Sequence, residues 1–194
     1  MKESHFYAMM SRLKLIDRWA LMRNSMPENL SEHSLEVAML AHALAVIGNR
    51  YFGKELDAKQ SALIGMYHDA TEIITGDMPT PIKYFNRDIQ EAFQAIEANA
   101  AYRLVMMLPE EMQEEFREIF EPGFQYEYEK KLVKAADKLS ALMKCIEEAK
   151  AGNREFAQAE QATLEAITAM KLPEVEYFMK KFLPSYYKTL DELQ

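Results

Sequence analysis

The 194-residue chain has few of the residues that cross-link or break a fold. Its single cysteine, Cys145, cannot form an internal disulfide, which fits a reducing compartment. Only six glycines and seven prolines occur, and β-branched residues are sparse, whereas Ala, Leu, Met, Glu and Lys are abundant. This composition, without repeats, low-complexity tracts or linkers, predicts an all-α protein with one compact helical domain over residues 1–194.

Positive charge is also scarce, with 23 Lys and Arg against 31 Asp and Glu and a net charge of -8. This balance disfavours binding to nucleic acid, which depends on basic side chains that neutralise phosphates. A small anionic substrate remains possible, because a metal ion and one or two Arg residues can reverse the local field. No uninterrupted apolar run approaches the ~18 residues of a membrane span, and the N-terminus lacks a signal-peptide core. We therefore expect a cytoplasmic protein that binds neither membrane nor nucleic acid.

The apolar spacing predicts a series of amphipathic helices. Ser31 is expected to cap the second of them, and Asp57 with Gln60 resembles a capping box at the start of the third. Gly76 is expected just after the third helix, before a proline-rich loop. The predicted helices cover approximately residues 3–22, 32–49, 58–75, 86–108, 109–120, 127–151, 153–170 and 173–193.

The stretch MYHDATEIITGDMPTP, residues 66–81, carries the most distinctive chemistry. On a helix, Glu72 shares a face with His68 and with Asp69, and the neighbouring residues are apolar. Burying such groups costs several kcal/mol unless something pairs them, and a metal ion would do so. A capped or solvated His-Asp pair is the structural alternative.

Two distant residues could complete a metal site. His33 heads a core-facing helical stripe, and Asp137 lies in mid-helix among alanines, where Asp is a poor helix former. Two His and two carboxylates suit a divalent transition ion with open positions for water and substrate. A core His bonded to backbone and a salt bridge of Asp137 to Lys134 or Lys138 are the alternatives. His42 is rotated by about 180° from His33 and is assigned to structure or solvent.

Arg18 and Trp19 stand together near the end of the first predicted helix. Arg offers a planar fork for phosphate oxygens, and Trp offers a flat face for a base or a sugar. An exposed ion pair of Arg18 with Asp17 and a core anchor role for Trp19 are the structural interpretations.

The order His33, His68-Asp69, Asp137 resembles the H…HD…D pattern of the HD-domain metal phosphohydrolases, all-helical enzymes that hydrolyse phosphate esters. The four positions fall on three predicted helices in the right order. Within that superfamily the chain is similar to the bacterial 5'-deoxynucleotidases, homodimeric, cobalt-preferring enzymes that dephosphorylate deoxyribonucleoside 5'-monophosphates. The likeness covers essentially the whole chain, is loosest over residues 88–125 and near the C-terminus, and is densest over residues 4–6, 12–16, 18–19, 31–34, 67–70 and 75–81.

The resemblance implies one divalent metal ion per chain, with cobalt as the first choice and Mn, Zn or Cu as alternatives. Glu72 would be the acid/base residue, and Arg18 would orient the phosphate. The implied metal ligands are His33, His68, Asp69 and Asp137. The implied substrate-binding residues are Arg18, Trp19, Asp69, Asp77, Met78, Pro79, Thr80 and Asp137, and Met78 stands where Leu is expected.

Two other functions stay open at this point. Another HD activity, such as a cyclic-nucleotide phosphodiesterase or a nucleoside triphosphate hydrolase, would use the same ligands. A non-catalytic nucleotide or metal sensor on the same scaffold is the second, although it would not need a proton shuttle such as Glu72. The resemblance also implies a homodimer, whose interface the apolar Met and Tyr residues of the later helices could cover.

Overall fold

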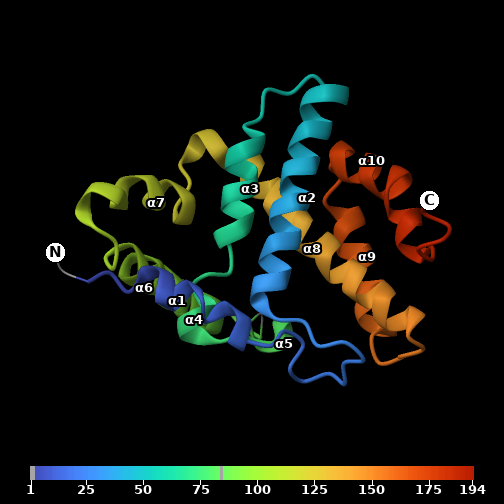
Figure 1. Cartoon of the computed structure of the whole chain (residues 1–194), viewed down its shortest axis with the longest axis horizontal. Helices are drawn as coiled ribbons and strands as arrows, with labels where there is room; N and C mark the ends of the chain where they lie inside the picture. The colour runs from blue at the N-terminus through green and yellow to red at the C-terminus, as the bar shows by residue number, and fades with distance from the viewer. Residues whose placement is uncertain (1–2, 84) are drawn as a thin grey trace.

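The computed structural model describes residues 3–83 and 85–194, and in this part of the chain helices alternate with loops (Figure 1). Its longest helices are α2 (Leu30–Tyr51), α6 (Arg87–Val105) and α8 (Glu127–Lys150). The described residues contain no β-strand, only an isolated bridge between Asp17 and Asn29. The predicted all-α class is therefore confirmed. The other elements are α1 (Phe6–Met10), η1 (Leu13–Leu15), α3 (Ala58–Tyr67), α4 (Glu72–Thr75), α5 (Thr80–Lys83), η2 (Glu110–Met112), α7 (Gln113–Phe120), η3 (Phe124–Tyr126), α9 (Ala157–Ala169), α10 (Pro173–Lys181) and η4 (Leu183–Tyr187).

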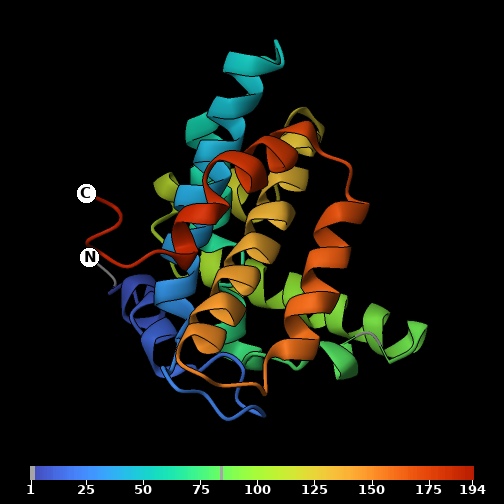
Figure 2. The same ribbon diagram turned by 90° about the vertical axis from the view of Figure 1, so that its right-hand side faces the viewer.

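Helix α2 lies at the centre and packs against α3, α8 and α10. The stripe predicted to face inward does so, because each of its members is buried: His33, Val37, Leu40, Leu44 and Ile47. Facing it, α8 contributes the fully buried Leu132, Leu139 and Ile146. Figure 2 shows α8 and α9 running side by side, so that α8 is covered on two flanks. The first turns of α2 and the middle of α8 are thereby fixed relative to each other.

The apolar character of α2 follows from this burial. By length and composition α2 could cross a membrane, since its best 18-residue window has a mean hydropathy of 1.2. Fifty-six per cent of that window is buried inside the protein, as in the core helix of a soluble protein. The uninterrupted apolar runs counted in the sequence did not reveal this helix, because Glu32, Glu36 and His42 interrupt them.

The predicted first helix over residues 3–22 is wrong. Helix α1 ends at Met10, and after η1 the chain runs irregularly to Asn29. Leu21, one of the apolar residues on which the long helix was predicted, does not pack inward, because it is 76% exposed. The second helix is also capped differently: the Asn29 side chain accepts from the backbone of Ser31 and Glu32, so the cap is Asn29 and not Ser31.

The predicted helix over residues 58–75 is broken in the middle. Asp57 caps its start as expected, but α3 ends at Tyr67 and α4 begins at Glu72. Between them the backbone tightens, with N–H groups of Ala70 and Glu72 bonded to carbonyls three residues back. The argument that His68 and Glu72 share a helix face therefore fails, and the turn itself sets their positions.

The remaining predicted helices exist, with shorter bounds in most cases. The helix predicted over residues 127–151 matches α8, and those predicted over 86–108 and 109–120 correspond to α6 and to η2 with α7. The last two are shortened to α9 and α10, because residues 153–156 and the C-terminal residues after η4 are not helical. Gly76 follows α4 with φ of +72°, a conformation that favours glycine.

A buried carboxylate fastens the irregular segment before α2 to the end of α8. Glu148 is 1% exposed and accepts hydrogen bonds from the backbone N–H of Ser25 at 2.9 Å and of Met26 at 3.2 Å. Asn153 donates to it at 2.8 Å, and Lys144 forms an ion pair with it. The loop that contains Arg18 and Trp19 is thus held by contacts more than a hundred residues away in the sequence.

These contacts predict a pH-dependent loss of stability. Burial alone would raise the pKa of Glu148, but hydrogen bonds from Lys144, Asn153 and the backbone lower this pKa to about 2. A carboxylate with a lowered folded-state pKa stabilises the fold above its unfolded pKa and stops doing so as the pH falls. We expect Glu148→Gln to lower the free energy of unfolding at pH 7 by about 2 kcal/mol, measured by urea denaturation.

The difference between this variant and the wild type should shrink from about pH 5 to about pH 2, where Glu148 becomes protonated. Glu147→Gln is the matched control, because Glu147 is the exposed neighbour on the same helix. A destabilisation that does not change with pH, or an equal one in the control, would contradict this role of Glu148.

Candidate metal centre

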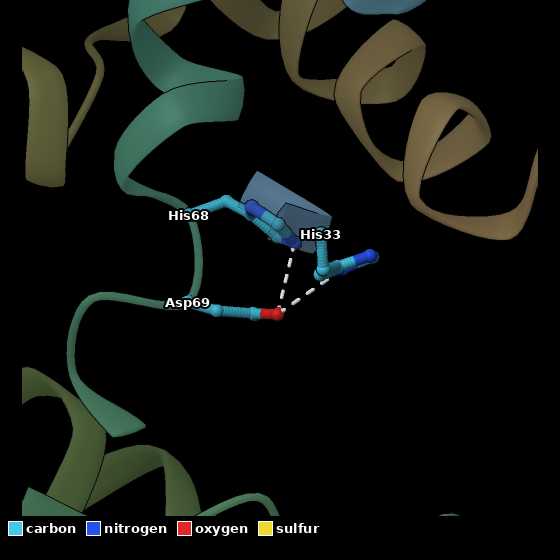
Figure 3. Close-up of side chains that lie close together, drawn as sticks. All are labelled: His33, His68 and Asp69. Atoms are coloured by element: carbon cyan, nitrogen blue, oxygen red, sulfur yellow. Dashed lines mark ion pairs between the residues drawn. The ribbon is translucent and has the colours of Figure 1, made fainter. Parts of the chain in front are cut away.

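Three potential metal ligands meet where α2 begins and α3 ends. His33 comes from the first turn of α2, His68 caps α3, and Asp69 follows in the turn (Figure 3). Asp69 Oδ2 lies 3.1 Å from His68 Nε2 and 3.4 Å from His33 Nε2. One ligand atom from each residue falls within 4.8 Å of the others, a spacing that allows one ion to contact all three.

Asp137 approaches the same centre from the middle of α8. Its Oδ1 is 3.2 Å from His33 Nε2 and 3.9 Å from Arg18 Nη2. In the described part of the chain its ion pairs are with these two residues, and not with Lys134 or Lys138. The side chain of Asp137 is 40% exposed, whereas that of His33 is fully buried. The centre is therefore closed on the α2 side and accessible beside Asp137.

The buried polar atoms at this centre fit a cation. Among the described residues, His33 Nε2 and His68 Nε2 are buried without a hydrogen-bond partner. His68 Nδ1 lies 2.8 Å from the carbonyl oxygen of Gly65, an acceptor, so Nδ1 carries the proton and Nε2 a lone pair. A lone pair directed at the oxygen of Asp69 is unfavourable unless a cation lies between them. Imidazole nitrogen and carboxylate oxygen are ligands of divalent transition metals, so these residues fit such an ion.

The pKa shifts of His68, Asp69 and Asp137 also indicate that this centre favours a positive charge. Burial alone would lower the pKa of His68, but Asp69 and Asp137 raise it, so their charges favour a positive charge at this position. Burial would raise the pKa of Asp69, but His68 and His33 hold it well below its usual range. Partial loss of solvent would raise the pKa of Asp137, but His33 and His68 lower it. The site favours carboxylates and one added positive charge.

Glu72 starts α4 beside this centre and is 5% exposed. Burial is the main cause that raises the pKa of Glu72 to about 9, and the negative charges of Asp69 and Asp77 add to it. Lys83 and Arg18 act in the opposite direction. A bound divalent cation would also lower this pKa, because it favours the carboxylate. A carboxyl group whose pKa is raised by burial can take up and release a proton during a reaction, which suits proton transfer.

Arg18 and Trp19 lie in the loop after η1 and share one acceptor. Glu28 Oε2 accepts a hydrogen bond from Arg18 Nη1 at 2.6 Å and another from Trp19 Nε1 at 3.2 Å. The predicted alternative of an Arg18–Asp17 ion pair is therefore replaced by a pair with Glu28. Trp19 is half-buried, and its ring contacts Phe156 edge-on with centroids 5.3 Å apart.

Glu28 is a residue that the sequence did not single out. It lies ten positions after Arg18 in an irregular segment, where no periodicity relates the two side chains. Trp19 adopts φ of +58°, which is strained for a bulky residue and persists only where surrounding contacts hold it. The bond to Glu28 is one of those contacts.

The loop after α4 lies close to these side chains. Burial raises the pKa of Asp77, while Arg18 and a hydrogen bond from the backbone of Trp19 oppose this rise. Met78 and Pro79 are half-buried beside it, and the side chain of Thr80 lies outside the described residues.

His42 is exposed and away from the site, as its rotation on α2 predicted. Cys145 is buried, which raises the pKa of its thiol to about 11 and keeps it neutral.

Comparison with known proteins adds relatives of high similarity. The profile of a family described as "5'-deoxynucleotidase YfbR-like" matches residues 5–186. Proteins named 5'-deoxynucleotidase YfbR in Escherichia coli O1:K1 / APEC and in Shigella boydii serotype 18 are 52% and 51% identical to the chain over 193 residues. These alignments cover 100% of the chain and 97% of each relative.

Solved structures show the same fold at lower sequence identity. An HD-domain phosphohydrolase from Listeria innocua matches with a TM-score of 0.81 and 23% identity, covering 94% of this chain and 88% of that one. A cyanophage S-2L HD phosphohydrolase (DatZ), bound to dA and one catalytic Zn2+ ion, matches with a TM-score of 0.66 and 21% identity, covering 94% and 96%. With an HD-domain fold and relatives that match over its full length, the chain belongs to the 5'-deoxynucleotidase YfbR-like family.

Proposed function

We propose that the centre hydrolyses deoxyribonucleoside 5'-monophosphates to deoxyribonucleosides and inorganic phosphate, with a divalent ion held by His33, His68, Asp69 and Asp137. The chain is a phosphohydrolase by family, and its 52% identical relatives are named 5'-deoxynucleotidases. The observation that carries the proposal is the pair of buried, unpartnered imidazole nitrogens directed at Asp69, with Arg18 Nη2 3.9 Å from Asp137 Oδ1.

The residues divide the work of hydrolysis among them. When bound, the ion supplies Lewis acidity to a water molecule and to a phosphoryl oxygen. Arg18 holds the phosphate oxygens through its planar fork and takes up the charge that develops on them. Glu72 accepts a proton from the attacking water and returns one to the 5'-oxygen as its bond to phosphorus breaks. The products are inorganic phosphate and a free 5'-hydroxyl, so atoms and charge balance.

Trp19 and the segment Asp77, Met78, Pro79 and Thr80 are assigned to the sugar and the base. Trp19 presents a flat ring, and Asp77 lies near its backbone and near Arg18. A ring held in place by Glu28 and Phe156 can exclude a 2′-hydroxyl by contact, since it cannot move aside easily. This arrangement favours deoxyribose over ribose.

The finer assignments extend this proposal. Cobalt is the proposed ion, with Mn, Zn or Cu as alternatives, because the same nitrogen and oxygen ligands accept several divalent ions. Residues 1–194 are proposed to form one domain of a cytoplasmic homodimer that binds neither nucleic acid nor membrane. Exposed apolar side chains such as Leu35, Met39 and Val46, which follow one face of α2, support a second copy as partner.

The first test measures substrate and metal dependence. We expect phosphate release from dAMP and dTMP by the metal-loaded protein, slower release from AMP, and loss of activity after treatment with a chelator. Cobalt or another divalent ion should restore it. Release of tripolyphosphate or pyrophosphate from nucleoside triphosphates, or cleavage of cyclic nucleotides without phosphate release from dAMP, would favour another HD activity. Tight binding of intact nucleotides would favour a sensor.

The second test concerns the proton shuttle. Glu72→Gln preserves the size of a buried side chain but cannot transfer a proton, so kcat for dAMP should fall by about 10²–10⁴-fold. Metal binding, followed by calorimetry, should remain within a factor of about two. Glu118→Gln on the exposed face of α7 is the control and should retain full turnover. Full activity of Glu72→Gln would remove Glu72 from the chemistry.

The third test concerns the shared acceptor of Arg18 and Trp19. Glu28→Ala removes both hydrogen bonds, so the phosphate and the sugar should be misplaced and kcat/KM for dAMP should fall by about 10²-fold. The ratio of kcat/KM for dAMP over AMP should also decrease, because Trp19 is released. Arg87→Ala breaks an exposed ion pair on α6 and serves as control. An unchanged ratio in Glu28→Ala would separate Glu28 from sugar discrimination.

A further inference from the structure

The second nitrogen of His33 belongs to a buried polar chain that joins α2 to α8. His33 Nδ1 lies 3.0 Å from Ser140 Oγ, and both residues are 0% exposed. Ser140 Oγ in turn donates to Glu36 Oε2 at 2.5 Å. His33 and Glu36 are three residues apart on α2, and Ser140 is three residues after Asp137 on α8. Each helix therefore contributes one proposed metal ligand, and beyond His33 the hydrogen bonds continue through Ser140 of α8 to Glu36 of α2.

The direction of these hydrogen bonds determines the tautomer of His33. A serine hydroxyl has one hydrogen, and Ser140 directs it to the Glu36 carboxylate at a distance typical of a charge-assisted bond. The Ser140 oxygen can then only accept from His33, so Nδ1 must carry the proton. Burial raises the pKa of Glu36, and the nearby charges of Glu28 and Glu147 add to this rise, while the hydrogen bond from Ser140 and the proximity of His33 oppose it.

With the proton on Nδ1, the lone pair of His33 is on Nε2, which faces Asp69 and Asp137. Ligating histidines commonly donate their other N–H to an acceptor that fixes ring orientation and increases basicity. Here the Ser140 hydroxyl is the acceptor for His33, and the Glu36 carboxylate in turn fixes the orientation of that hydroxyl. Without the hydrogen bonds through Ser140 to Glu36, His33 could carry its proton on Nε2, and its ring could rotate.

We propose that Ser140 and Glu36 are positioning residues that fix the tautomer and orientation of His33 for metal binding. This inference rests on the proposed function, since it presupposes that His33 is a ligand. Their roles differ from those of the ligands, because neither residue is expected to touch the ion or the substrate. The alternative is that the chain only joins α2 to α8, in which case its loss affects stability and not metal affinity.

The protein contains a matched control for Ser140. Ser34 is also a buried serine beside His33, but its hydroxyl has no hydrogen-bond partner among the described residues. Ser140→Ala and Ser34→Ala therefore remove the same atom from similarly buried positions in the same region. Only the first removes an acceptor for His33.

The experiment measures the affinity of chelator-treated protein for Co2+ and Zn2+ by competition with a chromophoric chelator. Ser140→Ala should weaken the affinity by about 10–100-fold, and Glu36→Ala should have a similar effect. Ser34→Ala should bind as the wild type does, and Glu36→Gln, which keeps an acceptor oxygen, should fall between. The visible absorption of the Co2+ form should change in Ser140→Ala, since the geometry around His33 alters.

The free energy of unfolding of the metal-free variants separates positioning from packing. If Ser140→Ala and Ser34→Ala have equal metal affinities and equal Co2+ spectra, the inference is overturned. This holds whether both variants keep the wild-type metal affinity or both lose it to the same extent. If Ser140→Ala does not fold, the half-buried Glu36 provides the decision, because unchanged affinity in Glu36→Ala also overturns it. A wild-type protein that binds no divalent ion would instead refute the metal site, and with it the proposed function.

Discussion

The structure depends on one electrostatic constraint: two imidazole nitrogens without hydrogen-bond partners and two carboxylates are brought together in a mostly buried space. His33 is fully buried and His68 nearly so, and Asp69 lies within 3.4 Å of both. Such a group of acceptors is unfavourable without a positive charge at its centre. The packing of α2 against α3 and α8 fixes the positions of His33 and Asp137 within this group.

The features predicted correctly from the sequence are those in which a buried helix face produces a regular spacing of apolar residues. The inward stripe of α2 and the length of α8 followed from apolar spacing, and Asp137 was noticeable because Asp is out of place in the middle of a helix. The order of His33, His68, Asp69 and Asp137 then indicated the family, which the comparisons confirm. These signals are local, so a single sequence contains them.

What the sequence could not predict is set by contacts across long separations. The helix predicted over residues 3–22 does not form as one helix. Leu15 and Leu21 face solvent there, and hydrogen bonds with polar side chains hold the irregular segment in place. Glu148 binds the backbone of Ser25 from a position 123 residues away, and Glu28 joins Arg18 to Trp19 without any regular spacing. The break after Tyr67 differs, because its hydrogen bonds are local, and no Gly or Pro stands between Tyr67 and Glu72 to mark it. None of these hydrogen bonds leaves a periodic pattern in the sequence.

The two kinds of contact correspond to two parts of the proposed site. The proposed ligands His33 and Asp137 stand within long helices whose backbone is fixed by the core, and they require geometry that changes little. Arg18, Trp19 and Asp77, which are proposed to bind the substrate, stand on loops, and Glu28 holds the first two in place. Substitutions in such loops can alter the substrate while the metal centre remains intact. A shared fold with low identity, as in the Listeria innocua and cyanophage proteins, therefore specifies less about the substrate than full-length identity of 52% does.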